Sequence, residues 1–403
     1  MALGTGRDHT STVATTAVPR AHLTVVCGAR LFDGTRPVPL AAPTVVIDGS
    51  RITAVGVPVP EHAAVVDLPG TTLLPGLVDT HVHLAFDGSA DPIGTLAAWD
   101  DTAALAAMTD AARTVARAGI TTVRDLGDRC FLALDLRDRA EPGLPTIVAS
   151  GPPLTTPGGH CHYLGGESSD VRATVRAHAE RGVDVIKIMA SGGNLTPGSR
   201  PELGQFEPDE LRAAVDEAHR LGLPVTAHAH GRQAVVDAVA AGVDGLEHVT
   251  FMTADGVDPV PRDLLAEIVA RRVVLGLTVG AVPGAAVLPP MAVRLPALLA
   301  NARLLCASGA PITAGTDGGV SPGKPHDVLP YGIEALVRIG MSPADALVAT
   351  TSRAAEVCGL GDRTGRLAPG FDADVLAVDG DPLTEPAALR RVRAVFARGV
   401  RVR

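Results

Sequence analysis

The chain has 403 residues, 46% of them hydrophobic, and its 35 basic and 44 acidic side chains give a net charge of −9. This length accommodates a barrel of about 250 residues and a small accessory domain. The acidic balance argues against nucleic acid and anionic membranes as partners, which leaves small-molecule or dipeptide-like substrates. No stretch approaches the roughly 18 apolar residues of a membrane span. The five scattered cysteines lack CxxC spacing, so a reducing cytoplasm is the expected location.

Short β-branched runs occur at both ends of the chain, after a polar, Thr-rich leader at residues 1–20 that is expected to be disordered. Strands are predicted at residues 23–33, 44–55, 373–380 and 391–403. Asp48-Gly49 is typical of a hairpin turn within the second run. Because neither end has enough strands for a stable sheet, residues 21–73 and 361–403 are predicted to form one composite β-sandwich domain.

Between these ends, residues 74–360 alternate short apolar strands with Ala/Leu/Arg-rich helices, the pattern of parallel βαβ units. The predicted strands are residues 77–83, 119–125, 146–150, 184–190, 224–230, 245–251, 273–279 and 311–317. Eight such strands predict an α/β fold of the (β/α)8 TIM-barrel type. One last helix is expected to begin at Ser342, with Pro343 in its first turn, and to end before Gly359.

Ionisable residues interrupt these apolar strands, although an unpaired polar group in a buried parallel strand costs several kcal/mol. His81 and His83 lie two residues apart on one strand, so both side chains point to the same side, as chelation of one ion requires. Lys187 lies between two isoleucines. His228, His248 and Asp317 lie at or near strand ends, the positions from which such barrels draw catalytic groups.

The chemistry of these residue types points to a metal centre. Imidazoles and carboxylates are common ligands of zinc and related ions, whereas an ammonium repels cations. Lys187 fits among such ligands if CO2 has converted its amine to a carbamate, which is anionic and can bridge two metals. Arg124, Asp79 and Asp125 are interpreted as structural, and Glu247 is expected to face away from its neighbour His248.

The ordered motifs carry a family resemblance. LLPGLVDTHVHL, VIKIMASGG, VTAHAHG, GLEHV, TAGTDGG and GRLAPGFDADVLAVDGDPL resemble the amidohydrolase superfamily, and more narrowly its binuclear imidazolonepropionase-like and Xaa-Pro dipeptidase-like branch. The similarity covers the chain from about residue 23. It implies two divalent ions, zinc first and manganese, cobalt or iron as alternatives. By resemblance, the first metal is bound by His81, His83 and Asp317, the second by His228 and His248, with carboxylated Lys187 as the bridge.

The mechanism implied by this site is attack by a metal-bridging hydroxide on an amide carbonyl. Asp317 is the expected proton shuttle between the hydroxide and the leaving amine. His160 and His162 are predicted to be catalytic, donating to the carbonyl oxyanion. The predicted substrate contacts, on the loops that follow the strands, are Tyr163, Arg200, His230, Arg232 and His326, and Lys324 is a further candidate for pairing with a substrate carboxylate.

Three classes of function compete. The leading one is hydrolysis of the amide bond of a dipeptide or N-acyl amino acid. The second keeps the same metals but cleaves a lactone, cyclic amide or phosphotriester. A deaminase is disfavoured because the mononuclear deaminases of this superfamily generally lack the bridging lysine. The third class, a non-catalytic scaffold, is disfavoured because every ligand position is filled. Many relatives of this architecture associate, so a homo-oligomer is an expectation that the sequence does not decide.

Overall fold

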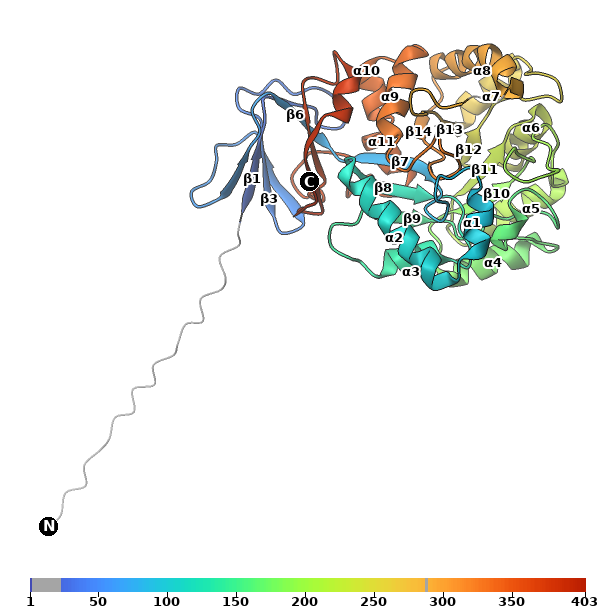
Figure 1. Cartoon of the computed structure of the whole chain (residues 1–403), viewed down its shortest axis with the longest axis horizontal. Helices are drawn as coiled ribbons and strands as arrows, with labels where there is room; N and C mark the ends of the chain where they lie inside the picture. The colour runs from blue at the N-terminus through green and yellow to red at the C-terminus, as the bar shows by residue number, and fades with distance from the viewer. Residues whose placement is uncertain (2–22, 287–288) are drawn as a thin grey trace.

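The computed structural model describes Met1, residues 23–286 and residues 289–403 (Figure 1). Met1 apart, the predicted leader at residues 1–20 lies outside the described residues. Figure 1 shows two sheets near the chain termini on one side and, on the other, a larger assembly in which helices surround parallel strands.

Two sheets contain the strands of the chain ends, and the second of them combines strands from both ends. The first has the order β4-β3-β1-β5, with β1 Thr24–Cys27, β3 Thr44–Asp48, β4 Arg51–Val55 and β5 Ala64–Asp67. The second has the order β17-β16-β15-β6-β2, with β2 Arg30–Leu31, β6 Thr71–Pro75, β15 Val375–Asp379, β16 Val392–Ala397 and β17 Val400–Arg401. The hairpin predicted at Asp48-Gly49 is confirmed, since β3 and β4 pair antiparallel and Gly49 has a φ of 56°.

Strand β15 joins the C-terminal segment to the N-terminal one by pairing antiparallel with β6, with Leu376 opposite Leu74. A single hydrophobic cluster contains buried residues of both sheets, among them Val26, Leu73 and Phe396. Side chains brought from the two ends of the sequence therefore share one core, because neither end supplies enough apolar surface alone.

The larger assembly contains parallel strands in sequence order, and all the strands predicted for residues 74–360 are confirmed. They are β7 Leu77–Val82, β8 Ile120–Asp125, β9 Thr146–Ala149, β10 Ile186–Met189, β11 Val225–Ala229, β12 Gly245–His248, β13 Val274–Thr278 and β14 Ile312–Gly315. They form a three-stranded sheet, β7-β8-β9, and a five-stranded sheet, β10-β11-β12-β13-β14. Adjacent strands pair in parallel, so their carboxyl ends lie at one edge.

Backbone hydrogen bonds connect the two parallel sheets at both of their edges. Between β9 and β10, Leu154 N donates to Lys187 O at 2.8 Å. Between β14 and β7, Asp317 N donates to His81 O at 2.8 Å and His83 N donates to Gly318 O at 3.0 Å. Residues that follow the strands thus bring His81 and Asp317, which are distant in the sequence, into direct contact.

Helices lie along the parallel strands (Figure 1). They are α1 Pro92–Ala98, α2 Asp101–Arg117, α3 Leu132–Asp138, α4 Val171–Arg181, α5 Pro208–Arg220, α6 Arg232–Ala241, α7 Arg262–Arg271, α8 Pro289–Ala307, α9 Leu329–Arg338, α10 Pro343–Val348 and α11 Ser352–Val357, with 3-10 turns η1 His162–Leu164 and η2 Pro386–Arg390. No helix among the described residues is long and apolar enough to cross a membrane.

The prediction of one last helix from Ser342 to Gly359 is wrong, because the structure divides it into α10 and α11. Ser342 does cap α10, its side chain accepting from Asp345 N at 3.1 Å. The break occurs where the carbonyl of Thr350 accepts a hydrogen bond from Val78 N on β7. The hydroxyls of Thr351 and Ser352 also bond to Gly34 O, so contacts with other segments replace the helical bonding there.

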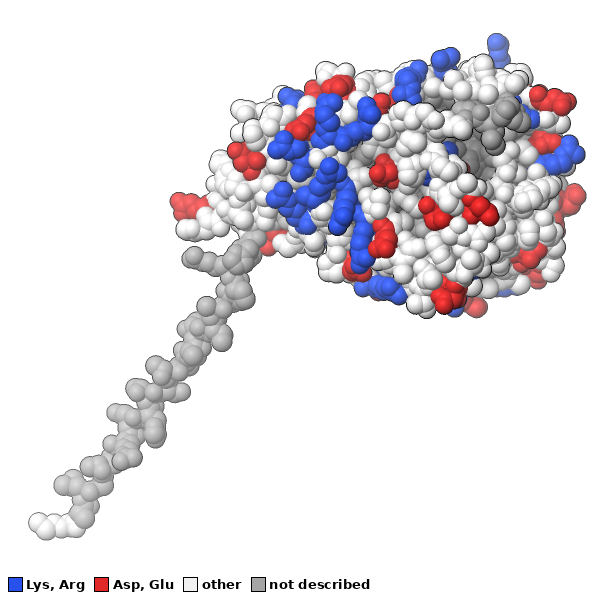
Figure 2. Space-filling view, viewed as in Figure 1, with Lys and Arg blue, Asp and Glu red and all other residues white. Residues whose placement is uncertain are grey.

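Arginines gather on one face of this acidic protein, around the C-terminal strands (Figure 2). Arg390, Arg391 and Arg393 are exposed there, and each is paired with a carboxylate, of Glu334, Glu385 and Asp379 respectively. Much of the positive charge on this face is therefore offset by neighbouring acids.

Candidate metal centre

Two clusters of metal-ligating side chains lie at the carboxyl ends of the parallel strands. The first contains His81, His83 and Asp317, and the second contains His228, His230 and His248. Within each cluster the potential ligand atoms lie within 4.8 Å of one another. The imidazole rings of His81 and His248 are 5.1 Å apart, so the two clusters adjoin.

The first cluster joins the end of β7 to the end of β14. Asp317 Oδ1 lies 3.3 Å from His83 Nε2 and 3.6 Å from His81 Nε2. Asp317 has a φ of 59°, in the left-handed region that non-glycine residues seldom adopt. Such strain clusters at functional sites, where the surrounding structure holds it in place.

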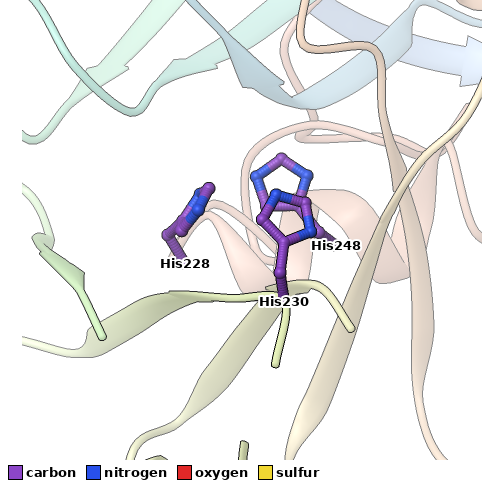
Figure 3. A group of neighbouring side chains, drawn as sticks. All are labelled: His228, His230 and His248. Carbon is purple, nitrogen blue, oxygen red and sulfur yellow. The ribbon is translucent and has the colours of Figure 1, made fainter. Parts of the chain in front are cut away.

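The second cluster includes one residue more than the ligand pair predicted from sequence (Figure 3). The ring of His230 stacks on that of His248 at 4.5 Å, and His228 lies 4.5 Å from His248. The sequence analysis assigned His230 to substrate contact. The spacing His228-Ala229-His230 repeats that of His81-Val82-His83, and this repeat is the signal that could have placed both histidines in one cluster.

Each histidine in these clusters has one ring nitrogen hydrogen-bonded, which leaves the other for a metal. His81 Nδ1 lies 2.9 Å from Glu247 Oε2, and His83 Nδ1 lies 2.9 Å from Gly127 O. The remaining partners are Gly192 O for His228 Nε2, Thr250 Oγ1 for His230 Nδ1 and Thr278 Oγ1 for His248 Nδ1. This arrangement fixes ring orientation in the way seen around protein-bound metals.

A network of buried charged residues holds the His81 ring through its Nδ1 atom. Glu247 faces away from His248, as expected, but this direction brings its carboxylate against His81. Its Oε1 accepts from Arg124 Nη2 at 2.8 Å and from Thr226 Oγ1 at 2.7 Å. Burial alone would raise the pKa of Glu247, but the charge of Arg124 and the hydrogen bond with His81 hold that pKa at about 2. Glu247 is therefore an ionised acceptor that places the His81 proton on Nδ1 and leaves Nε2 for a ligand.

Burial favours the neutral, metal-binding form of the imidazole at His81, His228, His230 and His248. It lowers the pKa of His81 to about 4 and that of His230 to about 3. His83 differs, because its hydrogen bond with Asp317 and the charge of that carboxylate outweigh burial and raise its pKa, and a metal would take the place of the proton there. The opposite holds for Asp317: burial raises the pKa of its carboxyl, but hydrogen bonding with His83 and the charges of His81 and Lys324 keep it well below its ordinary value. The donor set is thus neutral nitrogen with anionic oxygen, which suits zinc and related ions.

Lys187 lies on β10 with a side chain only 1% exposed, and its Nζ has no hydrogen-bond partner among the described residues. Burial lowers the pKa of this amine to about 8. Leaving a buried amino group unpaired costs several kcal/mol, so a group absent from the protein chain itself is needed to satisfy it. Carboxylation followed by metal binding satisfies this requirement, and the residues present therefore fit a metal centre.

The other predicted site residues have different surroundings. His160 is buried with its ring 4.9 Å from that of His228, and its Nδ1 has no partner among the described residues. His162, on η1, belongs to neither cluster, and its Nδ1 bonds to Gly159 O. Tyr163 is half-buried, with its hydroxyl 3.6 Å from Cys161 Sγ.

Two of the residues predicted to contact the substrate bond to other parts of the protein instead. Arg200 is 58% exposed and pairs with Glu202 at 2.6 Å, and His326 is buried with its Nε2 3.3 Å from His83 O. Arg232 is the exposed first residue of α6. His326 thus supports a residue of the first cluster, whereas the structure shows no contact of Arg232 with either cluster.

Known proteins share this fold and much of this sequence. An ochratoxinase from Aspergillus niger is 32% identical over 375 residues, which cover 80% of this chain and 73% of the ochratoxinase. An imidazolonepropionase from Rubrobacter xylanophilus is 27% identical over 379 residues, which cover 83% of this chain and 84% of that enzyme. A solved structure of a Xaa-Pro dipeptidase with bound methionine aligns with a TM-score of 0.82 at 27% identity, over 94% of this chain and 99% of the dipeptidase.

The sequence profile described as the Amidohydrolase family matches residues 72–402, a range that contains strands β7 to β14 and both ligand clusters. The match covers far more than half of the chain, and the three similar proteins named above are enzymes. The chain therefore belongs to the Amidohydrolase family.

Proposed function

We propose that this protein is a binuclear metal-dependent hydrolase that cleaves the amide bond of a dipeptide or an N-acyl amino acid. The observation that carries the proposal is the unpartnered, buried amine of Lys187 beside two adjoining ligand clusters. The family assignment supports amide hydrolysis. The structural similarity to a protein named as a Xaa-Pro dipeptidase supports a dipeptide-like substrate.

In this proposal His81, His83 and Asp317 would hold one divalent ion, His228 and His248 would hold the other, and a carboxylated Lys187 would serve as a ligand to both. His230 is close enough to His248 to act as a further ligand or to face the substrate. Zinc suits this set of ligands best, and manganese, cobalt and iron also accept it. When bound, the ion pair supplies polarisation of the scissile carbonyl and a lowered pKa for a bound water.

Residues of the chain then transfer the proton and position the substrate. Asp317 takes the proton from the nucleophilic water and returns it to the leaving amine, because its carboxylate touches both histidines of the first cluster. His160, buried beside His228 and with its Nδ1 unpartnered among the described residues, is proposed to donate to the carbonyl oxygen as negative charge develops there. His162 and Tyr163, on the same loop, are proposed to contact the substrate.

Two finer features of the fold belong to the same proposal. We infer that the parallel strands close into a (β/α)8 barrel over residues 74–360, supported by the hydrogen bonds that connect the two parallel sheets at both edges. We also infer that residues 21–73 and 361–403 form a composite β-sandwich domain, supported by the pairing of β15 with β6. A cytoplasmic location is proposed from the unpaired cysteines.

The test is amine release from a library of dipeptides and N-acyl amino acids, run beside lactones, a cyclic amide and a phosphotriester with zinc- or manganese-loaded protein. We expect amides to be turned over with kcat/KM above roughly 10⁴ M⁻¹s⁻¹. Activity confined to lactones or phosphotriesters would retain the metal centre but contradict the proposed bond. Protein that binds no metal and hydrolyses nothing would point to a non-catalytic scaffold.

A further inference from the structure

The chain contains only two lysines, Lys187 and Lys324, and every other basic side chain is arginine. Lysine and arginine are not interchangeable, because the ammonium is a compact point charge whereas the guanidinium is a planar fork. Lys187 needs an amine if it is to be carboxylated. Lys324 is not a metal-ligating side chain, but its charge helps to keep the pKa of the Asp317 carboxyl low, which makes its position worth following.

Lys324 lies on the loop after β14, and its amine is placed between the two clusters. Its Nζ donates to Thr316 O at 2.7 Å and approaches Thr278 O at 3.5 Å. Thr316 directly precedes Asp317 of the first cluster, and the Thr278 hydroxyl bonds to His248 of the second. The ammonium therefore lies at the carboxyl ends of β13 and β14. One residue, Thr316, links it to the first cluster, and another, Thr278, links it to the second.

The amine still has capacity to bind a ligand. An ammonium has three N–H donors, and the described residues provide two acceptors, one of them at the long limit of a hydrogen bond. The Lys324 residue is of intermediate exposure, in contrast to the buried Lys187. We infer that a ligand bound at the clusters can reach its amine.

Other cations near the mouth are less suited to the same task. Arg200 is neutralised by Glu202, with hydrogen bonds of 2.6 and 2.8 Å. Arg294 on α8 uses its guanidinium to bond to the backbone oxygens of residues 253, 254 and 256. Lys324 forms no salt bridge among the described residues, and Asp317 and Asp79 act on its charge only over a longer distance, so its amine can still donate to an incoming anion.

We propose that Lys324 binds the free carboxylate of the substrate, so that the enzyme selects amides whose leaving group is an amino acid with an unblocked carboxyl. The inference rests on the proposed function. In such a substrate the carboxylate is three bonds from the scissile carbonyl carbon, and it must therefore lie close to the two metals when that carbonyl does. A charge-assisted hydrogen bond from an ammonium is stronger and more selective than a neutral one.

The kinetic test compares N-acyl amino acids with their C-terminal carboxamides, which differ only in the charged group. We expect wild-type protein to prefer the acids, and Lys324→Met to raise KM for the acids by roughly 10- to 100-fold while leaving KM for the carboxamides unchanged. Lys324→Arg should retain part of the preference. Arg212→Met, an exposed change on α5, is the matched control for loss of a cation.

Two outcomes separate this inference from the proposed function. If wild-type protein hydrolyses acids and carboxamides equally well, or if Lys324→Met changes KM equally for both, Lys324 does not bind the carboxylate and the inference is overturned while the hydrolase remains. An equal fall in kcat alone reports the effect of the Lys324 charge on Asp317. If metal-loaded wild-type protein hydrolyses neither, the proposed function fails, and carboxylate binding is then decided by a measurement that needs no turnover.

That measurement is an NMR titration, which is simple to assign because the chain contains only two lysines. Protein labelled with ¹³C at the lysine ε carbon gives two NMR signals, and the one that disappears in Lys324→Arg identifies Lys324. We expect this signal to shift when an N-acyl amino acid is added and to stay unchanged with the carboxamide. Equal responses to both, or no response to the acid at saturating concentration, would overturn the proposal without requiring the Lys324→Met variant to fold.

Discussion

The two ends of the parallel strands are built from different arrangements of charge. At the carboxyl ends, buried groups such as Lys187 Nζ and His160 Nδ1 lack partners within the described chain, and Asp317 adopts a strained backbone conformation. At the amino ends of β9, β10 and β11 lies a cavity of about 510 Å3, which is also lined by charged residues. There Arg137 pairs with Asp184, and Arg398 donates to Thr146 and Leu144.

This difference links the carboxyl ends of the strands to catalysis and the amino ends to stability. Charged groups that satisfy one another contribute modestly to stability and need no ligand. Buried groups left unsatisfied by the chain imply that something else completes them. We therefore expect the carboxyl ends to be the functional edge, which is where barrels of parallel strands place their active sites. Variants at the two edges should have effects of different kinds.

Lys187→Ala is expected to have the largest effect. Without the amine no carbamate can form, so the two clusters lose their bridging anion, and kcat/KM should fall by at least about 1,000-fold with loss of tightly bound metal. Metal analysis after dialysis gives the direct measurement. Two tightly bound metals remaining in this variant would refute the bridging role.

The carbamate itself can be observed by adding ¹³C-bicarbonate to the wild-type protein. We expect one carbamate signal, which Lys187→Ala removes and Lys324→Arg retains. A carbamate signal that survives in Lys187→Ala would assign the modification to another amine.

Asp317→Asn should have the next largest effect, and it tests the proton shuttle. Asparagine keeps the shape of the side chain and also tolerates the left-handed conformation of residue 317, so the backbone need not move. The amide cannot accept and return a proton, and kcat should fall by roughly 10²- to 10⁴-fold. Product binding, measured by calorimetry, should change little. An active variant would contradict the role of Asp317.

Glu247→Gln is expected to have an intermediate effect that appears first in metal affinity. The glutamine amide can donate toward His81 Nδ1, which favours the tautomer with its proton on Nε2, the nitrogen that faces Asp317. Metal affinity should fall by roughly 10- to 100-fold, the usual cost of losing a residue that orients a ligand. Competition with a chelator measures this change.

The matched control for Glu247 is Glu217→Gln, since Glu217 is also a buried acid held by arginines, Arg176 and Arg220. It lies on α5 and is bonded to no cluster residue, so its loss should change the free energy of unfolding and leave metal affinity unaltered. Equal metal affinities in the Glu247 and Glu217 variants would show that the Glu247 contact does not position His81.

Sequence patterns were sufficient for the strands and for most of the clusters, for a physical reason. Histidines and an acid at the ends of otherwise apolar strands stand out because burial normally excludes them. His81, His83, His228, His248 and Asp317 were found in this way, and the structure brings them together. The family motifs added the expectation of metals and a bridging lysine.

Other features depend on contacts between distant segments, which periodicity does not encode. The break between α10 and α11 requires the bond from Val78 to Thr350, across more than 250 residues of sequence. The contact between Glu247 and His81 requires the register of several strands. The pairing of Arg200 with Glu202 could have been predicted, because the two residues are only two positions apart in the loop, but loop geometry decides whether they meet.

The smallest effect is expected at the amino-terminal edge, where Arg137→Met removes a partly exposed ion pair with Asp184 at 2.8 Å. Pairs of this kind contribute about 0.5–1 kcal/mol, so the free energy of unfolding should fall by that amount in denaturant titrations. kcat/KM and metal content should stay at the wild-type values, because Arg137 contacts neither cluster. A fall in kcat/KM or in metal content without a matching loss of stability would mean that the two edges are coupled, and the division between chemistry and stability would then have to be abandoned.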